Sequence, residues 1–162
     1  MTRPNARCAL VTGGHGFLGS HLVDALLDRG VRVRCLLRPG RPESLFSGRP
    51  VEVVRGDLRA ADGLAAAVEG ADLVFHVAGL IAARSPAEFH EVNAKGTARL
   101  AAAVAARGPV SRFVLVSSQA AAGPSLDGRP VTEDRPPGPL THYGRSKLAG
   151  ERALEAAGIP FT

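Results

Sequence analysis

The feature that most constrains this chain is a glycine-rich stretch between two apolar runs. The sequence VTGGHGFLGSHLVDAL, from Val11 to Leu26, places four glycines in seven residues where one run ends and the next begins. The first run, 7–12, has the continuous apolar character of a buried strand. The second, 17–29, has apolar residues at helical spacing and is closed by Gly30. A strand, a tight turn and a helix are therefore predicted in that order.

The rest of the chain repeats this alternation. Ser85 and Pro86 resemble an N-cap and a first helical residue, and Gly108 with Pro109 would stop that helix. Near-continuous rather than alternating apolar strands indicate a parallel sheet covered on both faces. The predicted fold is therefore an α/β, doubly wound parallel sheet, the Rossmann fold, with helices on both faces. Strands are predicted at 31–37, 51–55, 72–78 and 112–118, helices at 61–69, 85–107 and 141–157, a loop at 119–140, and the start of a sixth strand at 158–162.

Composition narrows the function classes. The 162 residues are 45% hydrophobic but only 4% aromatic, so one domain with a core of Ala, Val and Leu is expected. The net charge of +5 would permit nucleic-acid binding, but the basic residues are scattered and stacking aromatics are few, so no nucleic-acid partner is expected. Cys8 and Cys35 lack ligand spacing and are predicted to be buried, reduced thiols, with no metal. Without a signal-peptide core or a membrane-length apolar run, a cytoplasmic protein without a membrane partner is expected.

The glycines suit a diphosphate. Gly13, Gly16 and Gly19 form GxxGxxG directly after the first strand and at the opening of the first helix, with Phe17 and Leu18 between them. A dinucleotide diphosphate must approach such a backbone closely, and the helix N-terminus offers it N–H groups and partial positive charge. A purely structural turn is the alternative.

Two further segments bear on the choice of dinucleotide. After the second predicted strand, LLRPGR presents Arg38 and Arg41 and no carboxylate, which favours NADP, with NAD left open, unless Arg38 is only a solvated loop charge. In GDL, Asp57 with Leu58 is a candidate adenine contact, and Asp57 as a helix N-cap explains that residue equally well.

A tyrosine and a lysine suggest proton transfer. Tyr143 precedes Lys147 by four residues, so both project from one helix face. A free phenol is a weak base at neutral pH, and a neighbouring cation favours the phenolate. An isolated pair of this kind is usually a surface pair, but here it accompanies a glycine turn and Ser117–Ser118 at the end of a predicted strand.

The whole chain resembles the N-terminal part of an extended short-chain dehydrogenase/reductase. The resemblance is to the NAD-dependent epimerase/dehydratase family, including its dihydroflavonol reductase and 3β-hydroxysteroid dehydrogenase types. It rests on TGGHGFLG, GDL, FHVAG, NAKGT, FVLVSS and YGRSK, in the family's order.

The resemblance implies a catalytic set. Tyr143 would be the general acid/base, and Lys147 would bind the nicotinamide ribose and favour the phenolate. Ser118, chosen over Ser117 for its separation from the tyrosine, would hydrogen-bond the substrate oxygen. Asn93 would support the lysine through a water, unless it only bonds nearby helix backbone.

The resemblance also implies further cofactor contacts. Ala78 and Gly79 would line the cofactor through their backbone, and Ser117, Tyr143 and Lys147 would contact it. His15 would touch the phosphates or be a solvated loop residue. The remaining histidines considered receive no chemical role and are explained by packing or solvent: His21, His76 and His90.

The resemblance finally sets expectations for the domain content. Residues 1–162 would be the NAD(P)-binding domain of an enzyme that moves hydride to or from a carbonyl or alcohol carbon, truncated so that the C-terminal substrate domain is absent. The small-molecule substrate stays open among a nucleotide sugar, a sterol-like alcohol and a flavonoid-like ketone, and a homodimer is left open. The alternative is a non-catalytic nucleotide-binding module or an inactive truncated gene product.

Overall fold

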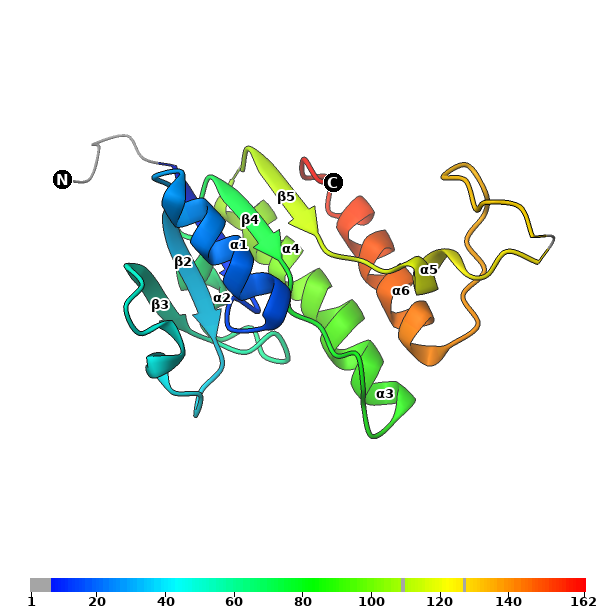
Figure 1. Ribbon diagram of the computed structural model, residues 1–162, viewed down its shortest axis with the longest axis horizontal. Coiled ribbons are helices and arrows are strands. Elements are labelled where there is room, and N and C mark those ends of the chain that lie inside the picture. The colour runs from blue at the N-terminus through cyan, green and yellow to red at the C-terminus, as the bar shows by residue number, and fades with distance from the viewer. Residues whose placement is uncertain (1–6, 109, 127) are drawn as a thin grey trace.

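Parallel strands form the centre of the computed structural model, which describes residues 7–108, 110–126 and 128–162. The strands of this part of the chain pair in the order β3-β2-β1-β4-β5, and every neighbouring pair is parallel (Figure 1). The order reverses between β1 and β4, which is the point where open α/β sheets bind ligands. The strands are β1 (Cys8–Thr12), β2 (Arg32–Leu37), β3 (Val51–Arg55), β4 (Leu73–His76) and β5 (Arg112–Leu115).

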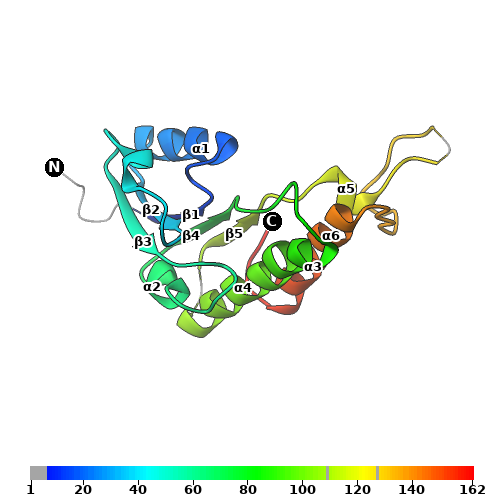
Figure 2. The same ribbon diagram turned by 90° about the horizontal axis from the view of Figure 1, so that it is seen from below.

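Helices cover both faces of this sheet. Figure 2 shows α1 on one face and α2, α4 and α6 on the other. The predicted doubly wound α/β fold is therefore confirmed. The helices are α1 (Phe17–Asp28), the 3-10 turn η1 (Glu43–Phe46), α2 (Leu64–Val68), α3 (Pro86–Phe89), the π-helical segment η2 (His90–Lys95), α4 (Gly96–Arg107), α5 (Gln119–Ala122) and α6 (His142–Ala156).

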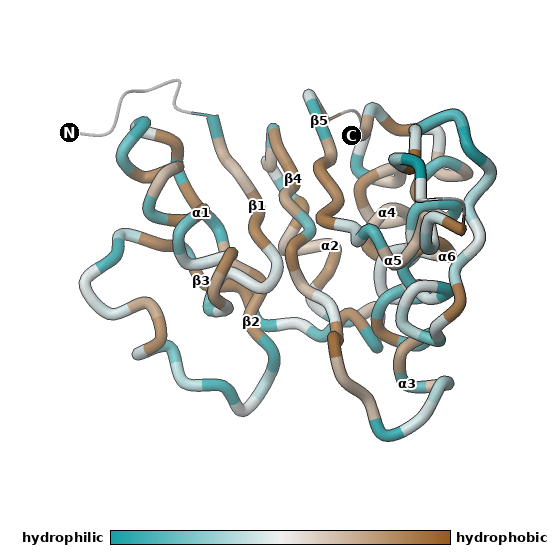
Figure 3. The backbone as a smooth tube through the Cα atoms, turned by 45° about the vertical axis from the view of Figure 1, so that its right-hand side comes forward, coloured by the Kyte–Doolittle hydropathy of each residue, from teal (hydrophilic) through white to brown (hydrophobic). Residues whose placement is uncertain are grey.

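Each face of the sheet has its own apolar cluster. Successive residues of β1 alternate between them: Ala9 and Val11 pack with residues of α1, and Leu10 packs with residues of α2 and α4. The strands are apolar along most of their length (Figure 3). Among the described residues, the buried hydrophobic side chains are aliphatic apart from Phe46, Phe113, Cys8 and Cys35, as the composition predicts. Burial at about 25 cal/mol per Å² of apolar surface makes these two clusters the main stabilising term.

The long helix predicted over 85–107 exists, with an irregularity that sequence did not indicate. Ser85 caps it by accepting a hydrogen bond from the Glu88 N–H at 3.3 Å, and Pro86 occupies its first turn. The helix then passes through the π-helical segment η2 before α4. Gly108, with φ of 113°, follows its last residue, and the predicted role of Pro109 lies outside the described residues.

Three predicted elements differ in the structure. The segment 119–140, predicted as loop throughout, begins with the short helix α5, because Ser118 caps it by accepting from the Ala120 N–H at 3.2 Å. Helix α2 is shorter than the predicted 61–69. The sixth strand predicted at 158–162 appears as a parallel bridge between Phe161 and Phe113 at the edge of β5.

Cys8 and Cys35 are both buried and free. No helix in the described part of the chain has both the length and the apolar character that crossing a membrane requires.

The first turn is built from backbone atoms that nearly touch. Gly13 has φ of +72°, and a Cβ added there would lie 2.8 Å from the Ala78 nitrogen. A Cβ on Gly19 would overlap the Gly13 carbonyl oxygen. Side chains at these positions would push α1 and β4 away from the turn.

We expect Gly19→Ala to lower the free energy of unfolding by about 3 kcal/mol, because the new methyl group collides with backbone that cannot move aside. Gly16→Ala is the matched control, since a Cβ there would lie 3.3 Å from the Gly13 oxygen, and it should cost less than about 1 kcal/mol. Urea unfolding of the two variants measures both values. Equal losses would contradict the close approach described above.

Candidate active site

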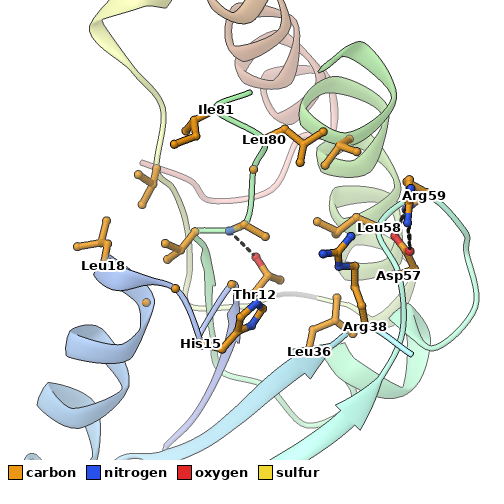
Figure 4. A pocket seen from close by; sticks show the side chains of 18 of the residues that line it. Thr12, His15, Leu18, Leu36, Arg38, Asp57, Leu58, Arg59, Leu80 and Ile81 are labelled. Carbon is orange, nitrogen blue, oxygen red and sulfur yellow. Dashed lines mark hydrogen bonds and ion pairs between the residues drawn. The ribbon is translucent and has the colours of Figure 1, made fainter. Parts of the chain in front are cut away.

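A pocket with a volume of about 420 Å³ opens where the strand order reverses. Its lining comes from the turn after β1, the end of β2, the GDL loop after β3, the segment after β4, residues of α3 and η2, and Val116 directly after β5. Figure 4 shows the side chains around this space. The carboxyl ends of the strands therefore open into one pocket, as expected for a dinucleotide site in this fold.

Most of the predicted cofactor residues meet at this pocket. Among the described residues, Ser117, Tyr143 and Lys147 are the predicted cofactor contacts that do not line it. The predicted residues that do line it are Gly13, Gly16, Phe17, Leu18, Gly19, Arg38, Asp57, Leu58, Ala78 and Gly79. Sequence reasoning missed the apolar wall, although most of it lies within or directly beside the quoted motifs. That wall includes Leu36, Val77, Leu80, Ile81, Val92 and Val116.

Basic side chains mark one end of the pocket. In Figure 4 the side chains of His15 and Arg38 both project into it. Burial, together with the charges of Arg41 and Arg38, lowers the pKa of His15. The His15 Nδ1 atom is buried and has no hydrogen-bond partner. A polar atom left in this state beside two guanidinium groups is suited to an anionic ligand.

Asp57 belongs to this end but does not cap a helix. The residue before α2 is Gly63, so the N-cap alternative for Asp57 is wrong. Its carboxylate instead accepts the Arg59 backbone N–H at 2.9 Å and pairs with the Arg59 guanidinium at 3.0 Å. Burial alone would raise the pKa of Asp57, but these bonds and the charges of Arg59 and Arg38 hold it below its usual range.

Lys147 is buried on α6 and reaches the sheet. Its Nζ donates to the Val116 carbonyl oxygen at 2.7 Å. Burial lowers the pKa of Lys147, and the Glu151 carboxylate opposes that shift. A Cβ added at Gly79, which lines the pocket, would lie 3.8 Å from the Lys147 nitrogen. The lysine therefore lies behind the pocket wall at Gly79, after β4, whereas Arg38 follows β2 on the other side of β1.

Asn93, in the π-helical segment, holds that wall in place. Its Oδ1 accepts the Leu80 N–H at 2.8 Å, and its Nδ2 donates to the Leu80 carbonyl at 3.0 Å and to Ser146 Oγ at 3.0 Å. These partners are distant in sequence. The alternative, in which Asn93 only bonds nearby helix backbone, is therefore wrong. Segments of π-helix are frequent at functional sites.

Tyr143 lies in the first turn of α6, which Thr141 caps by accepting the Gly144 N–H at 2.9 Å. The tyrosine ring is half-buried against Phe89, with ring centroids 5.8 Å apart. Ser146 donates to the Tyr143 carbonyl at 2.7 Å, so the Asn93 network extends to the tyrosine backbone.

The two serines after β5 have different partners. Ser118 caps α5, and α5 lies against α6 because Gly144 leaves room for the Ala120 carbonyl. The Ser117 hydroxyl donates to Glu151 on α6. Ser118 therefore begins the short helix that packs against the first turn of α6, whereas Ser117 ties the segment after β5 to Glu151 further along α6.

Comparison with known proteins agrees with this arrangement. The model of the NAD dependent epimerase/dehydratase family matches residues 9–160. The chain belongs to this family. It is 44% identical over 147 residues to a ceramide reductase of Caulobacter vibrioides, covering 91% of this chain and 41% of that protein. It is 39% identical over 165 residues to 3 beta-hydroxysteroid dehydrogenase type 7 of Mus musculus, covering 92% of this chain and 44% of that protein.

A solved structure supports the fold independently. The Bordetella bronchiseptica enzyme WbmG in complex with NAD superposes with a TM-score of 0.83 at 28% identity, covering 98% of this chain and 52% of that one. The chain spans less than half the length of the curated relatives it matches first.

Beneath the pocket, His76 is buried and uncharged. Burial, and next the charge of Lys147, lower the pKa of His76 to about 3. In the unfolded chain an ordinary histidine takes up a proton below pH about 6.5, whereas the folded chain keeps His76 neutral down to about pH 3. Acid therefore favours the unfolded chain through this residue, and the stability present above pH 6.5 is lost as the pH falls toward 3.

We predict that the free energy of unfolding of the wild type falls by about 1.4 kcal/mol per pH unit more steeply than that of His76→Gln between pH 6 and 4. Glutamine does not titrate, so the difference between the two slopes isolates this residue from the carboxylates. Urea unfolding across this range measures it. Parallel pH profiles would show that His76 protonates in the folded chain.

Proposed function

We propose that this chain is the cofactor-binding and proton-transfer part of an NAD(P)-dependent oxidoreductase that interconverts an alcohol and a carbonyl compound. The observation that carries the proposal is the close approach of Gly79, Asn93 and Lys147 at one wall of the pocket. A Cβ at Gly79 would lie 3.2 Å from Asn93 Oδ1 and 3.8 Å from Lys147 Nζ. A ribose hydroxyl bound at this glycine-lined wall would need a hydrogen-bond donor, and the buried Lys147 ammonium behind the wall is one.

The pocket fits a dinucleotide. The turn with Gly13, Gly16 and Gly19 lines the pocket, and α1 begins at its edge, with backbone N–H groups suited to a diphosphate. The unpartnered His15 Nδ1 lies at the end where Arg38 projects. Both features favour an extended anionic ligand with a further negative group near Arg38.

We infer that this ligand is NADP rather than NAD. Arg38, Arg41 and His15 gather where the adenosine ribose of a dinucleotide lies in this fold, and a 2′-phosphate would give them an anionic partner. The Asp57 carboxylate is already held by Arg59 and so repels a phosphate less than a free carboxylate would. A bidentate guanidinium pair is the strongest phosphate contact that side chains provide.

In the proposed mechanism the cofactor supplies or accepts the hydride. Tyr143 exchanges the proton at the substrate oxygen, and Ser118, at the start of α5, orients that oxygen by a hydrogen bond. Lys147 turns its ammonium from the Val116 carbonyl toward the ribose and favours the phenolate of Tyr143. Asn93 keeps Leu80, and with it the wall beside Lys147, in place.

The substrate is proposed to bind mainly to residues of a C-terminal domain, because the relatives are more than twice as long as the match. The names of two relatives, a reductase and a hydroxysteroid dehydrogenase, support alcohol–carbonyl chemistry over a non-catalytic module. A cytoplasmic location is proposed on the two buried free thiols.

We expect the chain to bind NADPH more tightly than NADH, and Arg38→Ala to weaken NADPH binding by about tenfold or more while leaving NADH binding nearly unchanged. Arg29→Ala, on the far end of α1, removes the same charge and is the matched control. Fluorescence titration with both nucleotides measures the four affinities. Tighter NADH binding by the wild type would reverse the assignment to NADP.

In a protein that joins this chain to a C-terminal substrate domain, Tyr143→Phe should lower turnover by ~10²- to 10⁴-fold with little change in NADPH affinity. Lys147→Ala should lower both, because the ammonium serves the ribose as well as the phenol. Steady-state kinetics and nucleotide titration separate these effects. Turnover that survives Tyr143→Phe would exclude the tyrosine as the general acid/base, and tight nucleotide binding without turnover in the wild type would favour the non-catalytic module.

A further inference from the structure

His76 lies at the end of β4, directly before the segment that walls the pocket. It is 1% exposed, and its neighbours come from each packed element. Thr12 on β1 approaches Nδ1 at 2.6 Å, and Thr97 on α4 approaches Nε2 at 3.0 Å. The Phe113 ring on β5 meets the imidazole edge-on, with ring centroids 6.1 Å apart, and Lys147 on α6 supplies the nearby charge.

The Thr97 contact fixes which ring nitrogen carries the proton. The Thr97 hydroxyl donates to the Asn93 carbonyl oxygen at 2.7 Å, because a carbonyl can only accept. A hydroxyl has one hydrogen, so Thr97 Oγ1 can only accept from His76. Nε2 therefore carries the proton.

The Thr12 contact then follows. A neutral histidine protonated at Nε2 has a free lone pair at Nδ1, so the Thr12 hydroxyl donates to it. The oxygen of Thr12 in turn accepts the Ala78 N–H at 3.2 Å. All four hydrogen bonds thus point one way, from Ala78 through Thr12, His76 and Thr97 to the Asn93 carbonyl.

Both ends of this chain of hydrogen bonds lie beside the site. Ala78 lines the pocket and packs against the glycine turn, where a Cβ on Gly13 would lie 2.8 Å from its nitrogen. At the other end, a Cβ on Gly150 would lie 2.7 Å from the Asn93 oxygen and 3.3 Å from Thr97 Oγ1, so α6 crosses directly over these atoms. Helix α6 carries Lys147.

We propose that His76 is a positioning residue, held as the neutral Nε2–H tautomer, that sets the spacing between the Ala78 side of the pocket and the Asn93–α6 layer that carries Lys147. The proposal rests on the function proposed above. In a histidine that only filled space, the tautomer would not depend on its hydrogen-bond partners, and those partners could be lost without effect on the pocket. Here a proton added at Nδ1 would face the Thr12 hydroxyl hydrogen. The row of hydrogen bonds from Ala78 to Asn93 would then have to reverse or break.

Thr97 allows the sharpest test, because it takes part in this row of hydrogen bonds but does not line the pocket. In Thr97→Val, His76 loses its acceptor at Nε2 and should shift toward the Nδ1–H tautomer, donating to Thr12. Thr97→Ser keeps the hydroxyl and should behave as the wild type. Phe113→Leu, which removes only the ring contact, should lower stability without moving the tautomer.

Three measurements on the 162-residue chain follow. Imidazole ¹⁵N spectra at pH 7 should report Nε2–H in the wild type, Thr97→Ser and Phe113→Leu, and increased Nδ1–H in Thr97→Val. Amide exchange at Ala78 should be faster in Thr97→Val than in Thr97→Ser. NADPH affinity should fall about tenfold in Thr97→Val, the loss expected for one buried hydrogen bond.

Rescue supplies a second set of variants. His76→Gln, which offers one donor and one acceptor, should retain more NADPH affinity than His76→Leu at matched stability. An Nδ1–H or charged His76 in the wild type would overturn the proposal, and so would unchanged Ala78 exchange in Thr97→Val. If the wild type does not bind NADPH, the proposed function fails, while the tautomer and the exchange rates still decide the role of His76.

Discussion

The site depends on how closely the backbone after β1 approaches the backbone after β4. With no side chain at Gly13, the turn lies against Ala78, and with none at Gly19, α1 lies against the turn. These two approaches place the beginning of α1 beside the switch point of the sheet, where the pocket opens. The segment 77–80 then continues toward Asn93 and Lys147. A widening of a few tenths of an ångström at the turn would therefore be felt at both ends of the pocket.

The sequence was sufficient to predict those parts of the site that depend on local backbone geometry and spacing. The glycine turn needs residues without a Cβ at fixed spacing, so the positions of Gly13, Gly16 and Gly19 predicted both the strand–turn–helix unit and one wall of the pocket. Arg38 followed from its place directly after a predicted strand. Tyr143 and Lys147 could be placed on one helix because their spacing equals one helical turn.

The remaining features depend on approaches between distant segments. Asn93 bonds Leu80 and Ser146 because the π-helical segment packs against α6 at this point. No local sequence pattern predicts either contact. Ser117, a predicted cofactor contact, donates to Glu151 on α6, and that partner too is distant in sequence. For His76 the sequence left packing and solvent open, and the structure buries it. What sequence could not indicate is that a threonine from β1 and another from α4 would meet its two nitrogens.

The contact of Lys147 with the Val116 carbonyl has a thermodynamic consequence. Removing an ammonium group from water is costly, and here folding bears that cost, because the lysine is already buried and already hydrogen-bonded before any ligand arrives. A ligand hydroxyl at the pocket wall would then exchange one oxygen acceptor for another instead of desolvating a free cation. Ligand binding at that wall therefore carries no further desolvation cost for the ammonium, because the folded chain has already met it.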